Sequence, residues 1–168
     1  MAKMILFSLF GMFLLAACDE TGEGELLEYI HGPHAEYRYI EEDLTMMYDE
    51  YQTAADLGDE EEMFSIIVND LQPQIELMNN YLHDIKLSHK DNQDLHSMLL
   101  AEAEYYLAAL NVEEEAFIAA IEEEDDERAA ELFQERDVYY EQAYEQSLLF
   151  QTRMDVLLQR HEISAEGS

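Results

Sequence analysis

Apolar side chains recur at alternating spacings of three and four residues along most of the chain, which is the period of an amphipathic α-helix. The first such stretch, over about residues 35–57, carries the apolar stripe Tyr37, Ile40, Leu44, Met47, Tyr51 and Ala54. Gly58 follows it, and glycine readily adopts the left-handed conformation that commonly ends a helix. Asp59 and Glu62 have the spacing of an N-terminal capping pair. The pattern therefore predicts a helix that ends at Gly58 and a second that begins at about residue 60.

The second helical pattern covers about residues 60–89, with an apolar stripe of Met63, Ile67, Leu71, Ile75, Met78, Leu82 and Ile85. Pro73 lies inside it. Proline has no N–H to bond the carbonyl of Asn69, and its ring clashes with that carbonyl at a cost of ~3 kcal/mol. We therefore expect either a kink near Pro73 or two shorter helices.

Two further helical patterns follow an interruption at residues 91–94. The third helix is expected to run to about residue 123, with Leu95, Leu99, Ala103, Tyr106, Leu110, Phe117 and Ile121 facing inward. The fourth covers about residues 126–161, with a stripe of Ala129, Phe133, Tyr140, Ala143, Ser147, Phe150, Met154 and Leu157. Its period is close to 3.5 residues, and only Arg136 is out of place in it.

The last two patterns are symmetric about Asp125, as the two arms of an antiparallel helical hairpin must be. Residues equally far from this turn are apolar or small at each level: Ile121 with Ala129, Phe117 with Phe133, Leu110 with Tyr140, and Ala103 with Ser147. No segment with the period of a β-strand competes. The sequence thus predicts an all-α fold, an antiparallel up-down-up-down four-helix bundle with a kink or break near Pro73.

The N-terminus has the composition of a secretory signal peptide. Lys3 precedes an apolar run of about a dozen residues and then small residues, and this run is shorter than the ~20 residues of a membrane-spanning helix. The segment Leu15-Ala16-Ala17-Cys18 resembles a bacterial lipobox. That resemblance to a bacterial lipoprotein precursor implies cleavage after Ala17 and attachment of a diacylglycerol group to the thiol of Cys18.

These features divide the chain into four parts. Residues 1–17 are assigned to the signal peptide, and residues 18–34 to the lipidated cysteine, a flexible tether over 19–25 and a short apolar turn. Residues 35–163 are expected to form the helical bundle, and residues 164–168 a disordered tail. The part beyond the lipobox, including the segment Leu95–Tyr105, resembles uncharacterised small helical lipoproteins of bacilli.

Charge limits the partners of this chain. It has 40 acidic and 8 basic residues and a formal net charge of −32. Such a charge repels the phosphates of nucleic acid and an anionic membrane surface, so we expect no nucleic-acid partner and assign membrane attachment to the lipid on Cys18. Adaptation to a saline or alkaline exterior and specific cation binding both remain open as explanations of the charge.

No metal or cofactor site is predicted. The acidic turn at residues 122–127 lacks the alternating ligands and central glycine of an EF-hand, which favours a solvated turn over calcium binding. Glu28 and His31 have the spacing found in di-iron bundles, but such a centre needs two pairs. The remaining histidines considered, His83, His89 and His96, cannot share one continuous helical face.

One hairpin is rich in tyrosine, with Tyr105, Tyr106, Tyr139, Tyr140 and Tyr144 near its middle. These rings could line a groove for a peptide or small ligand, but core packing is the favoured interpretation, because tyrosine can bury its ring and keep its hydroxyl at the wet edge. Catalytic patterns are missing from the sequence: Ser65, Ser88, Ser97 and Ser147 have no nucleophile-elbow context. We therefore expect that the chain is not an enzyme.

The combined expectation is a non-catalytic helical module anchored by Cys18 at the extracytoplasmic face of the cell membrane. Its expected partner is a protein or peptide of the cell envelope. Two alternatives are an acidic cation-binding or charge-buffering surface protein and a small-ligand sensor.

Overall fold

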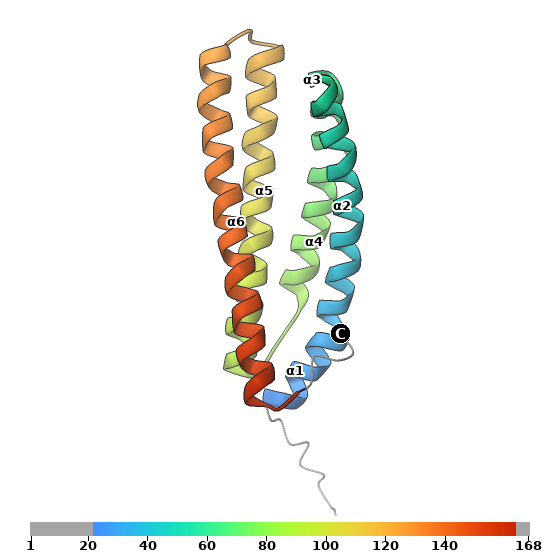
Figure 1. Ribbon diagram of the computed structural model, residues 1–168, viewed down its shortest axis with the longest axis vertical. Helices are drawn as coiled ribbons and strands as arrows, with labels where there is room; N and C mark the ends of the chain where they lie inside the picture. Colours follow the sequence, from blue (N-terminus) through green and yellow to red (C-terminus); the bar gives the residue numbers. More distant parts are fainter. Residues whose placement is uncertain (1–21, 164–168) are drawn as a thin grey trace, which may run out of the picture.

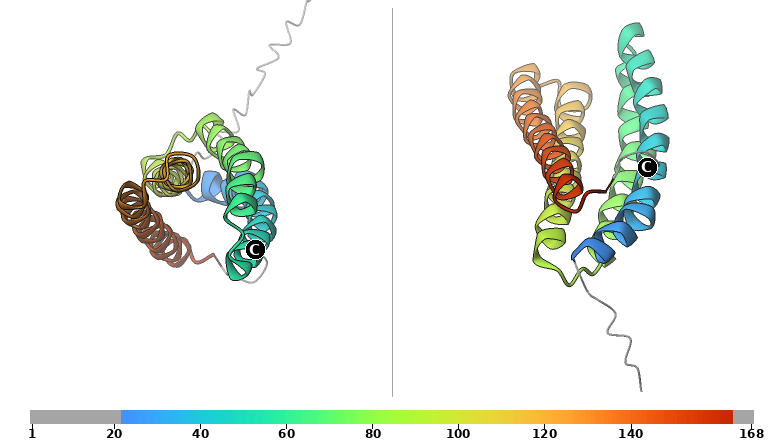
Figure 2. Two further views of the ribbon diagram at one scale, coloured as in Figure 1. Left: turned by 90° about the horizontal axis from the view of Figure 1, so that it is seen from above. Right: turned by 60° about the horizontal axis from the view of Figure 1, so that its bottom comes forward.

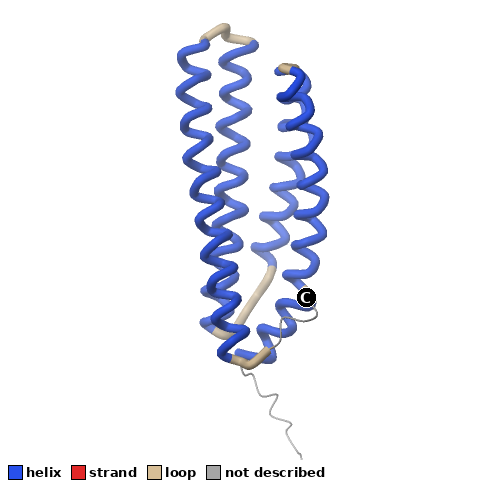
Figure 3. The backbone as a smooth tube through the Cα atoms, viewed as in Figure 1, coloured by secondary structure: helices blue, strands red, loops and turns tan. Residues whose placement is uncertain are grey.

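A computed structural model describes residues 22–163, and every secondary-structure element within that range is helical (Figures 1 and 3). The elements in chain order are α1 (Gly22–His31), α2 (Pro33–Leu57), α3 (Glu60–Ile66), the π-helical turn η1 (Ile67–Leu71), α4 (Gln72–Asp84), α5 (Lys90–Ile121) and α6 (Asp126–Arg160). This confirms the all-α class and the four long helical stretches. The signal peptide, Cys18 and the tail at 164–168 lie outside the described residues.

The turn between α2 and α3 follows the sequence prediction. Gly58 adopts the left-handed conformation with φ 69° and ψ 29°. The Asp59 carboxylate then accepts a hydrogen bond of 3.1 Å from the backbone N–H of Glu62. The helix end at Gly58 and the capping role of Asp59 are therefore confirmed, whereas the backbone N–H of Asp59 donates to the carbonyl of Ala54 and not to the Glu62 side chain.

Near Pro73, where a kink or two shorter helices were expected, a π-helical turn joins α3 to α4 without a gap. The backbone N–H of Gln72 donates to the carbonyl of Ile67, five residues earlier, so the helix is wider over Ile67–Leu71. Such π-turns occur where a helix must absorb a local irregularity. The chain continues directly into α4.

The second helical stretch ends at Asp84, not at residue 89 as expected. Ile85 is extended (φ −70°, ψ 127°), and the chain crosses to α5 as the long tan segment of Figure 3. The interruption expected at residues 91–94 is also wrong, because α5 begins at Lys90. Asp91 in its first turn accepts hydrogen bonds from Arg153, at 2.6 Å, and from Arg160.

The flexible tether expected over residues 19–25 is wrong for residues 22–25, because these residues form the start of α1. This helix is held by burial, since Leu26 and Tyr29 are 0% and 1% exposed. It is also held by Glu25, whose carboxylate accepts bonds from the backbone N–H of Ser88 and His89. Glu25 thus caps the N-terminus of α5, where His89 makes no side-chain cap of its own.

The helices pack as two pairs joined along α4 and α5. α6 lies along α5, whereas α2 lies beside α1, α3, η1 and α4 (Figures 1 and 2). No Cα atom of α6 is within 8 Å of a described helix other than α5, and none of α2 is within 8 Å of α5. The predicted pairing of Phe117 with Phe133 is confirmed by their edge-on contact, with ring centroids 5.4 Å apart. None of the described helices combines the length and apolar composition that crossing a membrane requires.

Glu25→Gln is expected to destabilise the protein by about 1–2 kcal/mol at pH 7, because it weakens the cap on α5. Hydrogen bonds from Ser88 and Asn92 outweigh burial and lower the pKa of Glu25 to about 2. Its stabilising effect is therefore complete above pH ~4.5 and is lost as the pH falls through about 2.

Urea unfolding of the full-length chain at several pH values measures both effects. The matched control is Glu23→Gln, on an exposed position of the same helix. Equal stability of the two variants at pH 7 would contradict the capping role.

Candidate functional site

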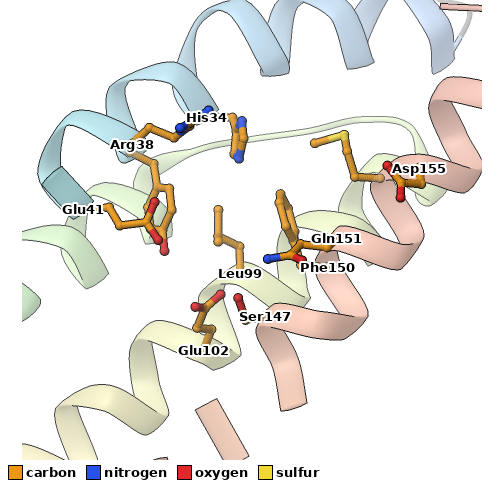
Figure 4. A pocket seen from close by; sticks show the side chains of 11 residues that line it. His34, Arg38, Glu41, Leu99, Glu102, Ser147, Phe150, Gln151 and Asp155 are labelled. Carbon is orange, nitrogen blue, oxygen red and sulfur yellow. The ribbon is translucent and has the colours of Figure 1, made fainter. Parts of the chain in front are cut away.

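A cleft of about 420 Å³ opens between α2, α5 and α6 (Figure 4). One face of α2 and one turn of α5 supply His34, Tyr37, Arg38, Glu41, Leu99 and Glu102. α6 supplies residues spaced three and four apart on a single face, namely Ser147, Phe150, Gln151, Met154 and Asp155. The volume lies within the range of about 300–1,000 Å³ that is usual for ligand pockets.

The cleft exists because only side chains bridge the distance between α2 and α6. The ring centroids of His34 and Phe150 are 5.3 Å apart, and His34 also stacks on Tyr37 at 6.1 Å. Burial is the main cause that lowers the pKa of His34, with the nearby charge of Arg38 adding to it. The rings therefore form a neutral aromatic wall at neutral pH.

Glu102 is the most perturbed carboxyl group in the cleft. It is 4% exposed, and Figure 4 shows its side chain close to that of Ser147. Burial raises its pKa to about 7; a hydrogen bond from Ser147 lowers it in part, and the charge of Glu41 raises it further. No ion pair to Glu102 forms within residues 22–163. The cleft thus contains a buried acid with one hydrogen-bond donor and no counter-charge in contact.

A second buried acid, Glu113, lies further along α5. It is 2% exposed, and it accepts hydrogen bonds from the hydroxyl of Tyr51 and Arg136 Nη1, both at 2.7 Å. The hydroxyl of Tyr140 donates to its other oxygen at 3.0 Å. Arg136, the residue out of place in the apolar pattern, is therefore the partner of a buried carboxylate. This cluster ties α2 to α6 through α5.

The tyrosine-lined groove considered from the sequence does not coincide with the cleft. Tyr106 packs against Tyr140, with ring centroids 6.0 Å apart, and Tyr140 binds Glu113. Tyr144 is 61% exposed. Tyr37 of α2 is the tyrosine that lines the cleft. Two of the five expected rings, Tyr106 and Tyr140, therefore serve packing, and the cleft lies one to two turns away along the same helices.

Sequence reasoning missed Glu102 and Glu113, although both carried a signal. Glu102 follows Leu99 by three residues, and Glu113 has the same relation to Leu110, so each acid stands on the inward stripe of its helix. In a chain with 40 acidic residues, this placement distinguishes a buried glutamate from a surface one. Arg136 on the facing stripe was the matching signal for Glu113.

His96 is held by hydrogen bonds inside the bundle. The ring of His96 is 8% exposed and lies 3.0 Å from the carbonyl oxygen of Leu82 through Nε2 and 3.1 Å from the Tyr29 hydroxyl through Nδ1. Burial lowers the pKa of His96. No group of three His, Cys, Asp or Glu in the described part of the chain is placed to hold a metal ion. The acidic turn at 122–127 is exposed, with Glu123 bound to Arg128.

No protein-family model matches the chain, and no curated protein or solved structure is significantly similar to it. The chemistry of the cleft therefore has to be read from its own residues. They offer a buried carboxyl group, an aromatic wall and an apolar floor formed by Leu99 and Met154.

Arg136→Met is expected to destabilise the protein by about 3–5 kcal/mol, because it leaves the buried carboxylate of Glu113 without its cation. The double variant Arg136→Met/Glu113→Leu should recover part of this loss, which chemical denaturation of the three proteins measures. Arg128→Met is the control: it removes an exposed pair with Glu123 and should cost less than about 1 kcal/mol. A double variant no more stable than Arg136→Met would argue against a buried ion pair.

Glu102→Gln is expected to change how stability depends on pH. A carboxyl group whose pKa is about 7 in the folded state stabilises the protein most below pH ~4.5, and this contribution is lost as the pH rises through 7. The wild type should therefore lose on the order of 2 kcal/mol more than the variant between pH 5 and pH 8. Urea unfolding at both pH values tests this, with Glu115→Gln on an exposed position of α5 as control. Parallel pH profiles for wild type and Glu102→Gln would refute it.

Proposed function

We propose that this protein is a non-catalytic binding module, anchored at the outer face of the cytoplasmic membrane by a lipid on Cys18, that binds a protein or peptide of the cell envelope. The observation that carries the proposal is the cleft, an opening between α2 and α6 with polar, aromatic and apolar groups on its walls. Catalysis is not part of the proposal.

The proposed anchor would hold the cleft near the membrane. Residues 19–21 alone separate Cys18 from α1, and so short a segment spans at most about 14 Å. His34 and Phe150, which line the cleft, are in aromatic contact, and His34 also lies 6.0 Å from the ring of Tyr29 in α1. The cleft is therefore at the end of the bundle where α1 lies, which is the end that the proposed anchor would hold at the membrane.

The proposed architecture is an antiparallel up-down-up-down bundle of four long helical stretches, left open on the side of α2 and α6. Such a scaffold is rigid along its axis and presents a fixed groove to a partner. The volume of about 420 Å³ also suits the second candidate function, a sensor for a small ligand. The alternative of an acidic charge-buffering surface protein uses no particular site.

Site-specific photocrosslinking in intact cells tests the proposal. A photoreactive residue at Gln151, on the exposed rim of the cleft, should capture one reproducible envelope partner. The same residue at Glu131, equally exposed on α6 but outside the cleft, should not capture it. Identical products from both positions would count against a partner in the cleft.

A Cys18→Ala variant tests the anchor in the same cells. Lipidation predicts that the wild type partitions into detergent with the membrane fraction, whereas the variant retains its leader and carries no diacylglycerol. Mass spectrometry of the N-terminal peptide distinguishes these forms. An unmodified Cys18 thiol in the wild type would overturn the proposed location.

A further inference from the structure

We propose that the cleft between α2, α5 and α6 is a receptor site for a primary alkylammonium group, with Glu102 as its counter-ion. The inference deepens the proposed function and rests on it, because it states which chemical group the partner inserts. It depends on the charge balance, the hydrogen bonding and the wall chemistry of this cavity.

Charge in the cleft favours a cation. Glu41, Glu102 and Asp155 contribute carboxyl groups to its lining, and Arg38 is the cationic side chain among the lining residues. Burial raises the pKa of Glu41, and the nearby charge of Arg38 lowers it in part. Glu102 therefore remains without a compensating charge, and a ligand with a positive charge would supply it.

The hydrogen-bond acceptor positions of Glu102 favour a cation that carries N–H groups. An ionised carboxylate has about four acceptor positions, and Glu102 receives one side-chain hydrogen bond, from Ser147. An ammonium group carries three donors and could bind Glu102 while also reaching the Ser147 hydroxyl. A quaternary ammonium group has no donor and would leave those acceptor positions unfilled.

The walls indicate that an alkyl chain carries the ammonium group. Leu99, Met154 and Phe150 are the apolar side chains that line the cleft. An aromatic face attracts an ammonium group through the cation–π interaction. A hydrated metal ion would gain nothing from these apolar contacts. A primary amine on an aliphatic chain combines these features, and a lysine side chain of the partner or a free alkyl amine would supply it.

Binding of this group should release protons. Glu41 and Tyr37 on α2 and Tyr106 on α5 interact electrostatically with Glu102, and Arg38 on α2 and Asp155 on α6 line the same cleft. The pKa of Glu102 is about 7, so its carboxyl group is partly protonated at pH 7. A cation favours the ionised form, so up to about half a proton should leave per ligand bound at pH 7.

Isothermal titration calorimetry of the full-length protein in nonionic detergent tests the inference. The probe is Nα-acetyl-lysine amide, and Nα-acetyl-norleucine amide is the matched control, since it lacks only the ammonium group. The lysine compound should bind saturably and at least tenfold more tightly. Its apparent enthalpy should differ between phosphate and MOPS buffers because of the released proton.

Two variants connect the binding to Glu102. Glu102→Gln should weaken the lysine probe at least tenfold and abolish the buffer dependence, while Glu115→Gln should bind like the wild type. Ser147→Ala should weaken binding severalfold, and circular dichroism confirms that each variant is folded. Equal affinity of Glu102→Gln and wild type, or equal affinity of the two probes, would overturn the inference.

A third probe, 1,5-diaminopentane, separates the sources of the ammonium group. Tighter binding of the lysine compound supports a peptide, and tighter binding of the diamine supports a free amine. The photocrosslink at Gln151 distinguishes failure of the ammonium site from failure of the proposed function. A partner captured at Gln151 by a protein that binds neither amine would overturn the ammonium site and leave the proposed function intact. Amine binding without a captured partner would support the site and overturn the protein partner.

Discussion

The arrangement of the helices depends on the buried carboxylate of Glu113. α2 and α6 have no close backbone approach, so their separation is set by side chains. Tyr51 from α2 and Arg136 and Tyr140 from α6 all donate to the same carboxylate on α5. A buried charge is costly unless each of its bonds is made, and this requirement holds the two outer helices at one distance. The cleft is the space that this distance leaves between α2, α5 and α6.

Two glutamates on the same face of α5 have opposite electrostatic surroundings. Glu113 lies roughly three turns beyond Glu102, and both are almost fully buried. Glu113 is paired with a guanidinium group and two hydroxyl groups, whereas Glu102 has one hydroxyl group and faces a cavity. The first arrangement is complete within the protein. The second is incomplete, which is why a ligand is expected at Glu102 and not at Glu113.

Much of this fold could be predicted from the sequence, because helical period and capping chemistry are local. The end of α2 at Gly58, the cap at Asp59 and the pairing of Phe117 with Phe133 all follow from spacing. The errors arose where distant residues decide the outcome. The extended segment after Asp84 is held in part by Glu25, far earlier in the chain, and the cleft depends on the separation of α2 and α6, which no spacing encodes.

The attachment of α1 to α5 has a mechanical consequence. The Glu25 carboxylate accepts hydrogen bonds from Ser88, His89 and Asn92, and the Asn92 side chain also donates to the carbonyl of Gly22. Under the proposed anchoring, tension between the bilayer and the domain enters through α1. The hydrogen bonds of Glu25 and Asn92 would transmit part of this force to the first turn of α5 as shear. The covalent chain through Gly32 would transmit the rest to α2. A pull from the membrane would then be shared between both helix pairs instead of peeling one away from the other.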